Sequence, residues 1–108
     1  MADIEETRIA PRKLIRSRAK VGLENGPTLS GRTVDISMTG ICVMVDGPIN
    51  PGHVCMIAFE ATVQGKPMMV TVMAKTVYSI CGRDGFRTGF QFMKVKPETN
   101  AILANLLA

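Results

Sequence analysis

The sequence predicts an all-β domain in which six antiparallel strands close into a small barrel and a short α-helix follows at the C-terminal end. Three observations predict this fold. Short segments of strand-like residues recur along the chain, and each is bounded by residues that favour turns. A length of 108 residues with 46% hydrophobic residues suits one domain with its own core. Six short strands in so small a domain favour a barrel, because closure removes exposed sheet edges.

The first half of the chain is expected to contain a tail, a connector and three strands. Residues 1–11 are polar and end at Pro11, so we predict a flexible N-terminal tail there, and residues 12–18 form a basic connector. The Asn25-Gly26 pair is typical of a hairpin turn and separates the first two strands. The strands of this half are expected over residues 17–23, 29–36 and 40–45.

The second half is expected to contain three longer strands joined by tight turns. Residues 46–52 are dense in Asp, Gly, Pro and Asn and predict a loop. Two further Gly-containing stretches, residues 64–67 and 82–85, predict hairpin turns. The strands of this half are expected over residues 53–63, 68–80 and 86–95.

The period of the apolar residues changes at the end of the chain. Pro97 suits the first turn of a helix. The four residues Ile102, Leu103, Leu106 and Leu107 then recur at helical spacing. We therefore expect a short amphipathic helix over residues 97–107 that packs on one end of the sheet, within a single domain over residues 12–108.

Charge and residue content limit the kinds of partner and chemistry. The net charge is +4, and six basic residues occur between Arg8 and Lys20 with no acid among them, which favours an anionic partner. The three cysteines form no CxxC pair and are expected to be buried free thiols of a cytoplasmic protein. The lone His53 has no neighbour that would orient it as a base, so we expect no enzyme, and neither a metal site nor a cofactor. No apolar run approaches the roughly 20 residues of a membrane span.

Two polar motifs are candidates for ligand binding. The hexapeptide Asp35-Ile36-Ser37-Met38-Thr39-Gly40 interrupts two apolar runs, and it can be either a plain turn or a cluster of ligand-binding groups. Arg12 and Arg16 have the spacing RxxxR. Arg8 and Arg12 share this spacing, and we select the later pair because it lies nearer the first strand. Guanidinium groups bind phosphate bidentately and pair with the O6/N7 edge of guanine, although an exposed charged connector also explains the pattern.

The order of these two motifs resembles that of the PilZ domain family, in which RxxxR precedes (D/N)xSxxG. Arg12 and Arg16 match the first motif, and Asp35, Ser37 and Gly40 match the second. The segment Gly89-Phe90-Gln91-Phe92 is similar to the end of the family's last strand, and a helix follows it in both. The resemblance extends from about residue 12 to residue 107.

The resemblance implies a PilZ-type barrel that binds cyclic di-GMP without catalysis and signals to an effector protein. Arg12 and Arg16 would hold phosphates and guanine edges or faces, and Asp35 would accept hydrogen bonds from guanine. Ser37 would contact phosphate or base, and Gly40 would allow close approach of the backbone. The possible helpers are Arg8, Lys13 and Arg18. Binding would order the arginine segment and create a surface for a motility, exopolysaccharide or signalling target.

Two alternatives belong to other functional classes. A small basic barrel can bind nucleic acid, but the chain has only four Phe, one Tyr and no Trp, and single-strand binders stack bases on such rings. A protein adaptor that binds no ligand would not need the complete pair of motifs.

Overall fold

The computed structural model describes residues 11–108 of the chain. The predicted tail over residues 1–11, apart from Pro11, and the candidate helper Arg8 lie outside the described residues.

Within residues 11–108 the chain forms one two-residue strand, six longer strands and one helix. The six longer strands and the C-terminal helix confirm the predicted fold class. The short strand β1 falls within the predicted connector and was not expected. The elements are β1 (Lys13–Leu14), β2 (Arg18–Leu23), β3 (Thr28–Ile36), β4 (Gly40–Val45), β5 (Val54–Val63), β6 (Lys66–Gly82), β7 (Gly85–Phe92) and α2 (Pro97–Leu107).

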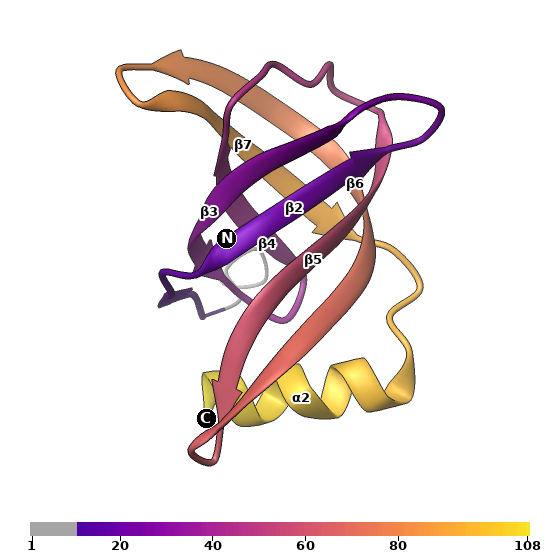
Figure 1. Ribbon diagram of the computed structural model, residues 1–108. Helices are drawn as coiled ribbons and strands as arrows, with labels where there is room; N and C mark the ends of the chain where they lie inside the picture. Colours follow the sequence, from indigo (N-terminus) through magenta and orange to yellow (C-terminus); the bar gives the residue numbers. More distant parts are fainter. Residues whose placement is uncertain (1–10) are drawn as a thin grey trace, which may run out of the picture.

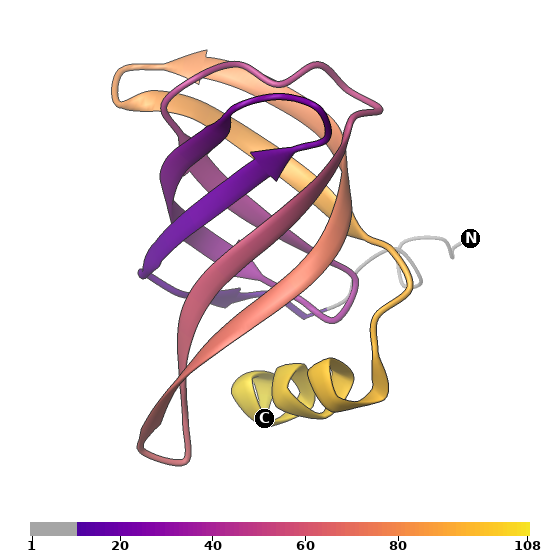
Figure 2. The same ribbon diagram turned by 45° about the vertical axis from the view of Figure 1, so that its right-hand side comes forward.

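The six longer strands close into an antiparallel barrel (Figures 1 and 2). Going round the barrel, β2 pairs with β3, β3 with β4, β4 with β7, β7 with β6, β6 with β5, and β5 again with β2. The short β1 pairs with the end of β3, where Leu14 lies opposite Asp35. The basic connector is therefore held beside the hexapeptide by backbone pairing.

The hairpin between β5 and β6 is tighter than the sequence suggested. Its turn consists of Gln64 and Gly65, which both have positive φ, at 51° and 79°. Because the turn takes only two residues, Lys66 and Pro67 already belong to β6. The strand β6 is therefore longer than predicted at its start, and it also continues past residue 80 to Gly82.

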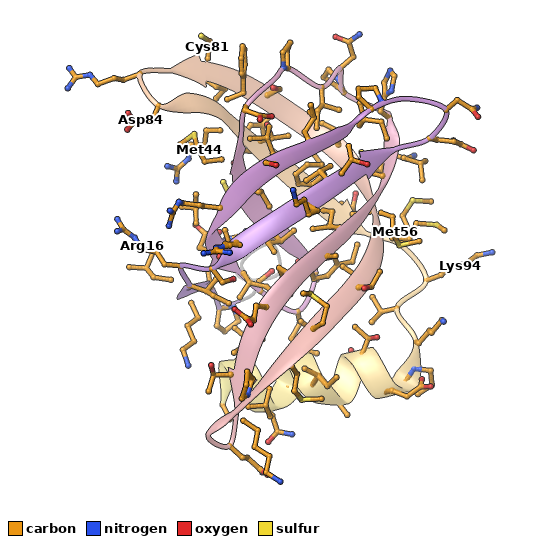
Figure 3. All side chains as sticks on the ribbon, viewed as in Figure 1. Arg16, Met44, Met56, Cys81, Asp84 and Lys94 are labelled. Atoms are coloured by element: carbon orange, nitrogen blue, oxygen red, sulfur yellow. The ribbon has the colours of Figure 1, made fainter. Side chains whose placement is uncertain are left out.

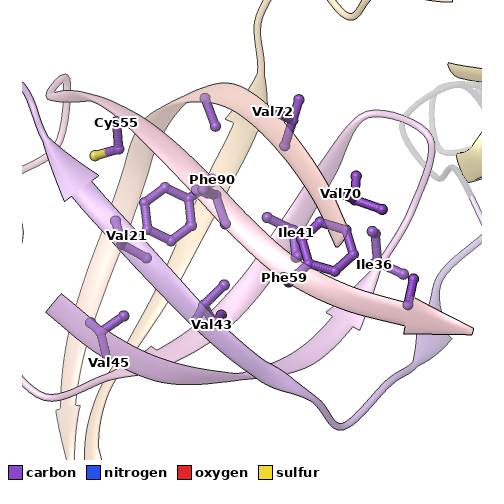
Figure 4. Packing of buried hydrophobic residues seen from close by; sticks show 14 of the residues in the cluster. Val21, Ile36, Ile41, Val43, Val45, Cys55, Phe59, Val70, Val72 and Phe90 are labelled. Carbon is purple, nitrogen blue, oxygen red and sulfur yellow. The ribbon is translucent and has the colours of Figure 1, made fainter. Parts of the chain in front are cut away.

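The core fills the barrel with aliphatic side chains and two phenylalanines. Alternate residues of each strand point inward, so that Val21, Ile41, Val43, Phe59 and Phe90 are all buried (Figure 4). Burying one such side chain contributes about 1.5–3 kcal/mol to folding. The amphipathic helix α2 covers one end of the barrel and adds Leu103 and Leu106 to the core (Figure 1).

Two of the three cysteines are buried as expected, and one is not. Cys42 and Cys55 are buried free thiols, whereas Cys81 is exposed. Cys81 lies opposite Phe86 near the tip of the β6–β7 hairpin, which projects beyond the core. In residues 11–108 we find no helix with the length and apolar character needed to cross a membrane.

Candidate functional site

The hexapeptide forms the turn between β3 and β4, and Ser37 fastens it. The Ser37 amide donates to the carbonyl oxygen of Gly40 at 2.9 Å. The Ser37 hydroxyl oxygen accepts hydrogen bonds from the amides of Thr39, at 3.1 Å, and Gly40, at 3.2 Å. Ser37 is 0% exposed, so its own amide and hydroxyl depend on these bonds because water cannot reach them.

Gly40 allows two strands to approach closely. A Cβ atom at this position would lie 2.3 Å from the carbonyl oxygen of Phe90 on β7. The family resemblance implied that Gly40 allows close approach of its backbone. Within the fold, the group that lies close to Gly40 is the neighbouring strand β7.

Arg12 reaches back over the turn and binds Asp35. The Arg12 Nε and Nη2 atoms lie 2.8 Å and 2.7 Å from the same carboxylate oxygen, Asp35 Oδ1. The Nη1 atom donates to Ser37 Oγ at 3.5 Å. The Arg12 side chain is 45% exposed and that of Asp35 is 17% exposed. Because exposed ion pairs contribute at most about 1 kcal/mol, this pair opens at little cost.

A cavity of about 610 Å³ lies beside this pair. Its lining includes Arg12 and Asp35 together with Val77 and Tyr78 of β6. The ring of Tyr78 lies on Gly89, where a Cβ atom would be only 2.2 Å from the ring carbon Cε2. The cavity thus offers a guanidinium group, a carboxylate and an aromatic ring together.

Sequence reasoning missed Tyr78 because a bulge places it there. The register of β6 against β7 shifts between Thr76 and Tyr78, which alters the inside–outside alternation at that point. Burial raises the pKa of Tyr78, and the phenol hydroxyl donates to Cys42 Sγ at 3.8 Å. Burial likewise raises the pKa of the Cys42 thiol, which stays protonated near neutral pH.

Arg16 does not join Arg12 and Asp35. It lines a different, larger cavity of about 810 Å³, together with Met44 and Asp84. Figure 3 labels these three side chains. The structure therefore brings together four of the five predicted site residues, Arg12, Asp35, Ser37 and Gly40, and places the fifth apart from them.

The two described helper candidates lie outside the Arg12–Asp35 cavity. Lys13 donates from Nζ to the carbonyl oxygen of Leu106 at 2.9 Å, near the end of α2. This bond satisfies a carbonyl group that the helix itself leaves unpaired. Arg18 is exposed on β2, opposite Arg32 of β3.

Comparison with protein families matches residues 6–108 to the PilZ domain. No curated protein matches the chain. Three similar solved structures have TM-scores between 0.65 and 0.75 and identities of 13–17%, which show a shared fold.

The first of these structures is the inhibitor of motility MotI/DgrA of Bacillus subtilis, with a TM-score of 0.75 and 13% identity over 90% of this chain. The chain spans about half of that protein, 47% of its length. The second is the PilZ domain of CeSA from a cellulose-synthesizing bacterium, with a TM-score of 0.65, 17% identity, and coverage of 91% of this chain and 95% of that one. The third is the PilZ domain of YcgR from Escherichia coli with c-di-GMP, with a TM-score of 0.67, 16% identity, and coverage of 91% and 86%.

Proposed function

The chain belongs to the PilZ domain family, and from this membership we propose that it is a non-catalytic receptor for cyclic di-GMP that signals to a partner protein. The observation that supports the proposal best is the meeting of Arg12, Asp35, Ser37 and Gly40 at one turn beside a cavity. These residues come from both family motifs, which are 23 positions apart when measured from Arg12 to Asp35. A related domain of known structure, that of YcgR, contains c-di-GMP.

The chemistry of the cavity suits the ligand. Cyclic di-GMP presents two phosphate anions and two guanine bases. The Asp35 carboxylate accepts hydrogen bonds from guanine N–H groups, and Arg12 binds a phosphate oxygen or the guanine O6/N7 edge. Tyr78 supplies an aromatic face on which a base can stack. Arg16 contributes a second guanidinium group from the neighbouring cavity.

We infer that Arg12 exchanges partners when the ligand binds. In the free protein two nitrogens of Arg12 contact one oxygen, Oδ1, of the carboxylate that guanine would use. The ligand offers Arg12 a phosphate in return and frees Asp35 for the base. The same movement takes Arg12 away from Ser37 Oγ, and Ser37, which is 0% exposed in the free protein, contacts the ligand only if this movement uncovers its hydroxyl. Gly40 keeps the turn close to β7.

This exchange gives a route from ligand to partner. The backbone of the segment that carries Arg12 and Arg16 already pairs with β3, so the ligand orders the two arginine side chains, and the new surface is recognised by an effector protein. The effector belongs to motility, exopolysaccharide synthesis or another signalling pathway. Free thiols at the cysteines are consistent with action in the reducing cytoplasm.

Calorimetric titration tests the proposal. Cyclic di-GMP should bind with micromolar or tighter affinity, about −8 kcal/mol or better, whereas GMP and single-stranded RNA should give no comparable heat. Arg12→Ala and Asp35→Asn should each weaken binding about 10- to 150-fold, the effect of losing a charge-assisted hydrogen bond. Arg83→Ala and Glu60→Gln are matched controls, because both residues are exposed and neither lines the cavity. An absence of heat with cyclic di-GMP, or equal binding of RNA, would contradict the proposal.

A further inference from the structure

Three arginines from separate segments line the larger cavity. Arg16 follows β1 in the connector, Arg32 lies on β3, and Arg87 lies on β7. Only Arg16 belongs to a motif that the sequence analysis identified. Arg32 and Arg87 are brought to it by the closure of the barrel.

Strand register places Arg32 and Arg87 on either side of one residue. Met44 of β4 lies opposite Arg32 on one side and opposite Arg87 on the other. Its neighbours Val43 and Val45 are buried in the core, so Met44 and the two arginines occupy the outer face of the barrel. With strands about 4.8 Å apart, the two arginines flank Met44 across roughly 10 Å, a distance that their long side chains can close.

The positive charge of this cavity is not neutralised by ion pairs in the described part of the chain. Two acids, Asp46 and Asp84, also line the cavity. Within residues 11–108, the only contact of 4.0 Å or less between a carboxylate and an arginine or lysine is that of Arg12 with Asp35. Three guanidinium groups therefore face one space with two carboxylates that do not pair with them, and an anion in that space would relieve their mutual repulsion.

The larger cavity adjoins the Arg12–Asp35 cavity on the same face. Cys42 lies opposite Asp35 and precedes Met44 by two positions along β4, which is about 7 Å. Arg87 is near enough to Tyr78 to oppose part of the rise that burial produces in the Tyr78 pKa. The two cavities are thus neighbouring parts of one surface.

The chemistry of the larger cavity selects a class of ligand. Guanidinium groups bind phosphate oxygens in pairs of parallel hydrogen bonds. Leu14, Val34 and Met44 add apolar lining, and Leu14 is 80% exposed. An anion that carries a planar base satisfies both features, because the faces of the base can pack on apolar side chains.

We propose that Arg32 and Arg87, together with Arg16, form a second phosphate-binding site that takes the phosphate of a nucleotide. This deepens the proposed function and rests on it. The phosphate has two possible sources, which are the second half of the cyclic dinucleotide bound at Asp35 and a separate nucleotide molecule. The site is the same for both.

Calorimetry with cyclic di-GMP on Arg32→Gln and Arg87→Gln tests the site. Each variant should bind at least about 10-fold more weakly or lose one of two binding events. A stoichiometry of one with weakened binding identifies a single molecule that spans both cavities, and the loss of one event from two identifies a separate molecule. Lys66→Gln, in the β5–β6 hairpin at the other end of the barrel, is the charge control and should bind normally. Affinity and stoichiometry unchanged in both arginine variants would overturn the proposal.

A second measurement separates this proposal from the proposed function. GMP at millimolar concentration should shift the NMR signal of the Met44 methyl group in the native chain, and the shift should vanish in the Arg32→Gln, Arg87→Gln double variant. If cyclic di-GMP fails to bind but this shift appears, the proposed function falls and the phosphate site stands. If neither occurs, both fall. Should a Gln variant unfold, Arg32→Lys and Arg87→Lys keep the charge while removing the paired donors, and they should still weaken binding.

Discussion

Replacement of Gly40 by alanine should destabilise the free protein through the barrel itself. The new Cβ atom would lie 2.3 Å from the Phe90 carbonyl oxygen, and such contacts are essentially never shorter than 3.0 Å. The added Cβ atom is attached to the backbone of β4 and meets backbone atoms of β7, so no side chain can rotate to relieve the contact. The two strands must therefore separate where they pair. Overpacking of this kind costs about 1–3 kcal/mol. For a domain of about 100 residues, a loss of 2 kcal/mol lowers the melting temperature by about 8–16 °C.

Two other glycines make the experiment internally controlled. At Gly22 an added Cβ would meet nothing closer than 3.8 Å, so Gly22→Ala should leave the melting temperature unchanged or raise it slightly. At Gly89 the added Cβ would meet the Tyr78 ring, which can swing away, so Gly89→Ala should cost less stability than Gly40→Ala and disturb the ligand cavity more. Thermal unfolding of all three variants without ligand measures the order of their melting temperatures. A Gly40→Ala protein as stable as Gly22→Ala would refute the reasoning and leave ligand contact as the reason for Gly40.

Three further predictions concern the site and its surroundings. Arg12→Ala should change the free energy of unfolding by less than about 1 kcal/mol, because its ion pair is exposed, and a loss above 2 kcal/mol in urea unfolding would instead indicate a structural role. Ser37→Ala should cost about 1–3 kcal/mol in the same assay, because two amides of the turn lose their acceptor, and an unchanged urea midpoint would contradict this. The free energy of unfolding should fall as the pH rises above about 9. Burial raises the pKa of Cys42 and Cys55 above the ordinary 9.0 and that of Tyr78 above the ordinary 10.0. These groups therefore lose their protons more readily in the unfolded chain, and alkaline pH favours unfolding. Urea midpoints that stay constant from pH 8 to pH 11 would contradict the last prediction.

Local patterns were sufficient to predict most of the secondary structure. Strand β4 begins at Gly40 and ends at Val45 as predicted, and α2 begins at Pro97. Spacing alone could not predict that β1 forms, because its two residues gain strand geometry only by pairing with Ile36 and Asp35. The exposure of Cys81 was missed for a similar reason, since its apolar neighbours did not reveal that the hairpin projects past the core.

The sequence by itself determined the barrel, its helix and the turn that carries Asp35, Ser37 and Gly40, because apolar period, turn chemistry and short motifs are local properties. Tertiary structure alone decided how the arginines divide between the two cavities. Arg12 binds Asp35 while Arg16 faces Arg32 and Arg87, and Tyr78 enters the cavity because a bulge turns it outward. These outcomes depend on the register between strands far apart in the chain, and a shift of one residue would turn each side chain to the opposite face.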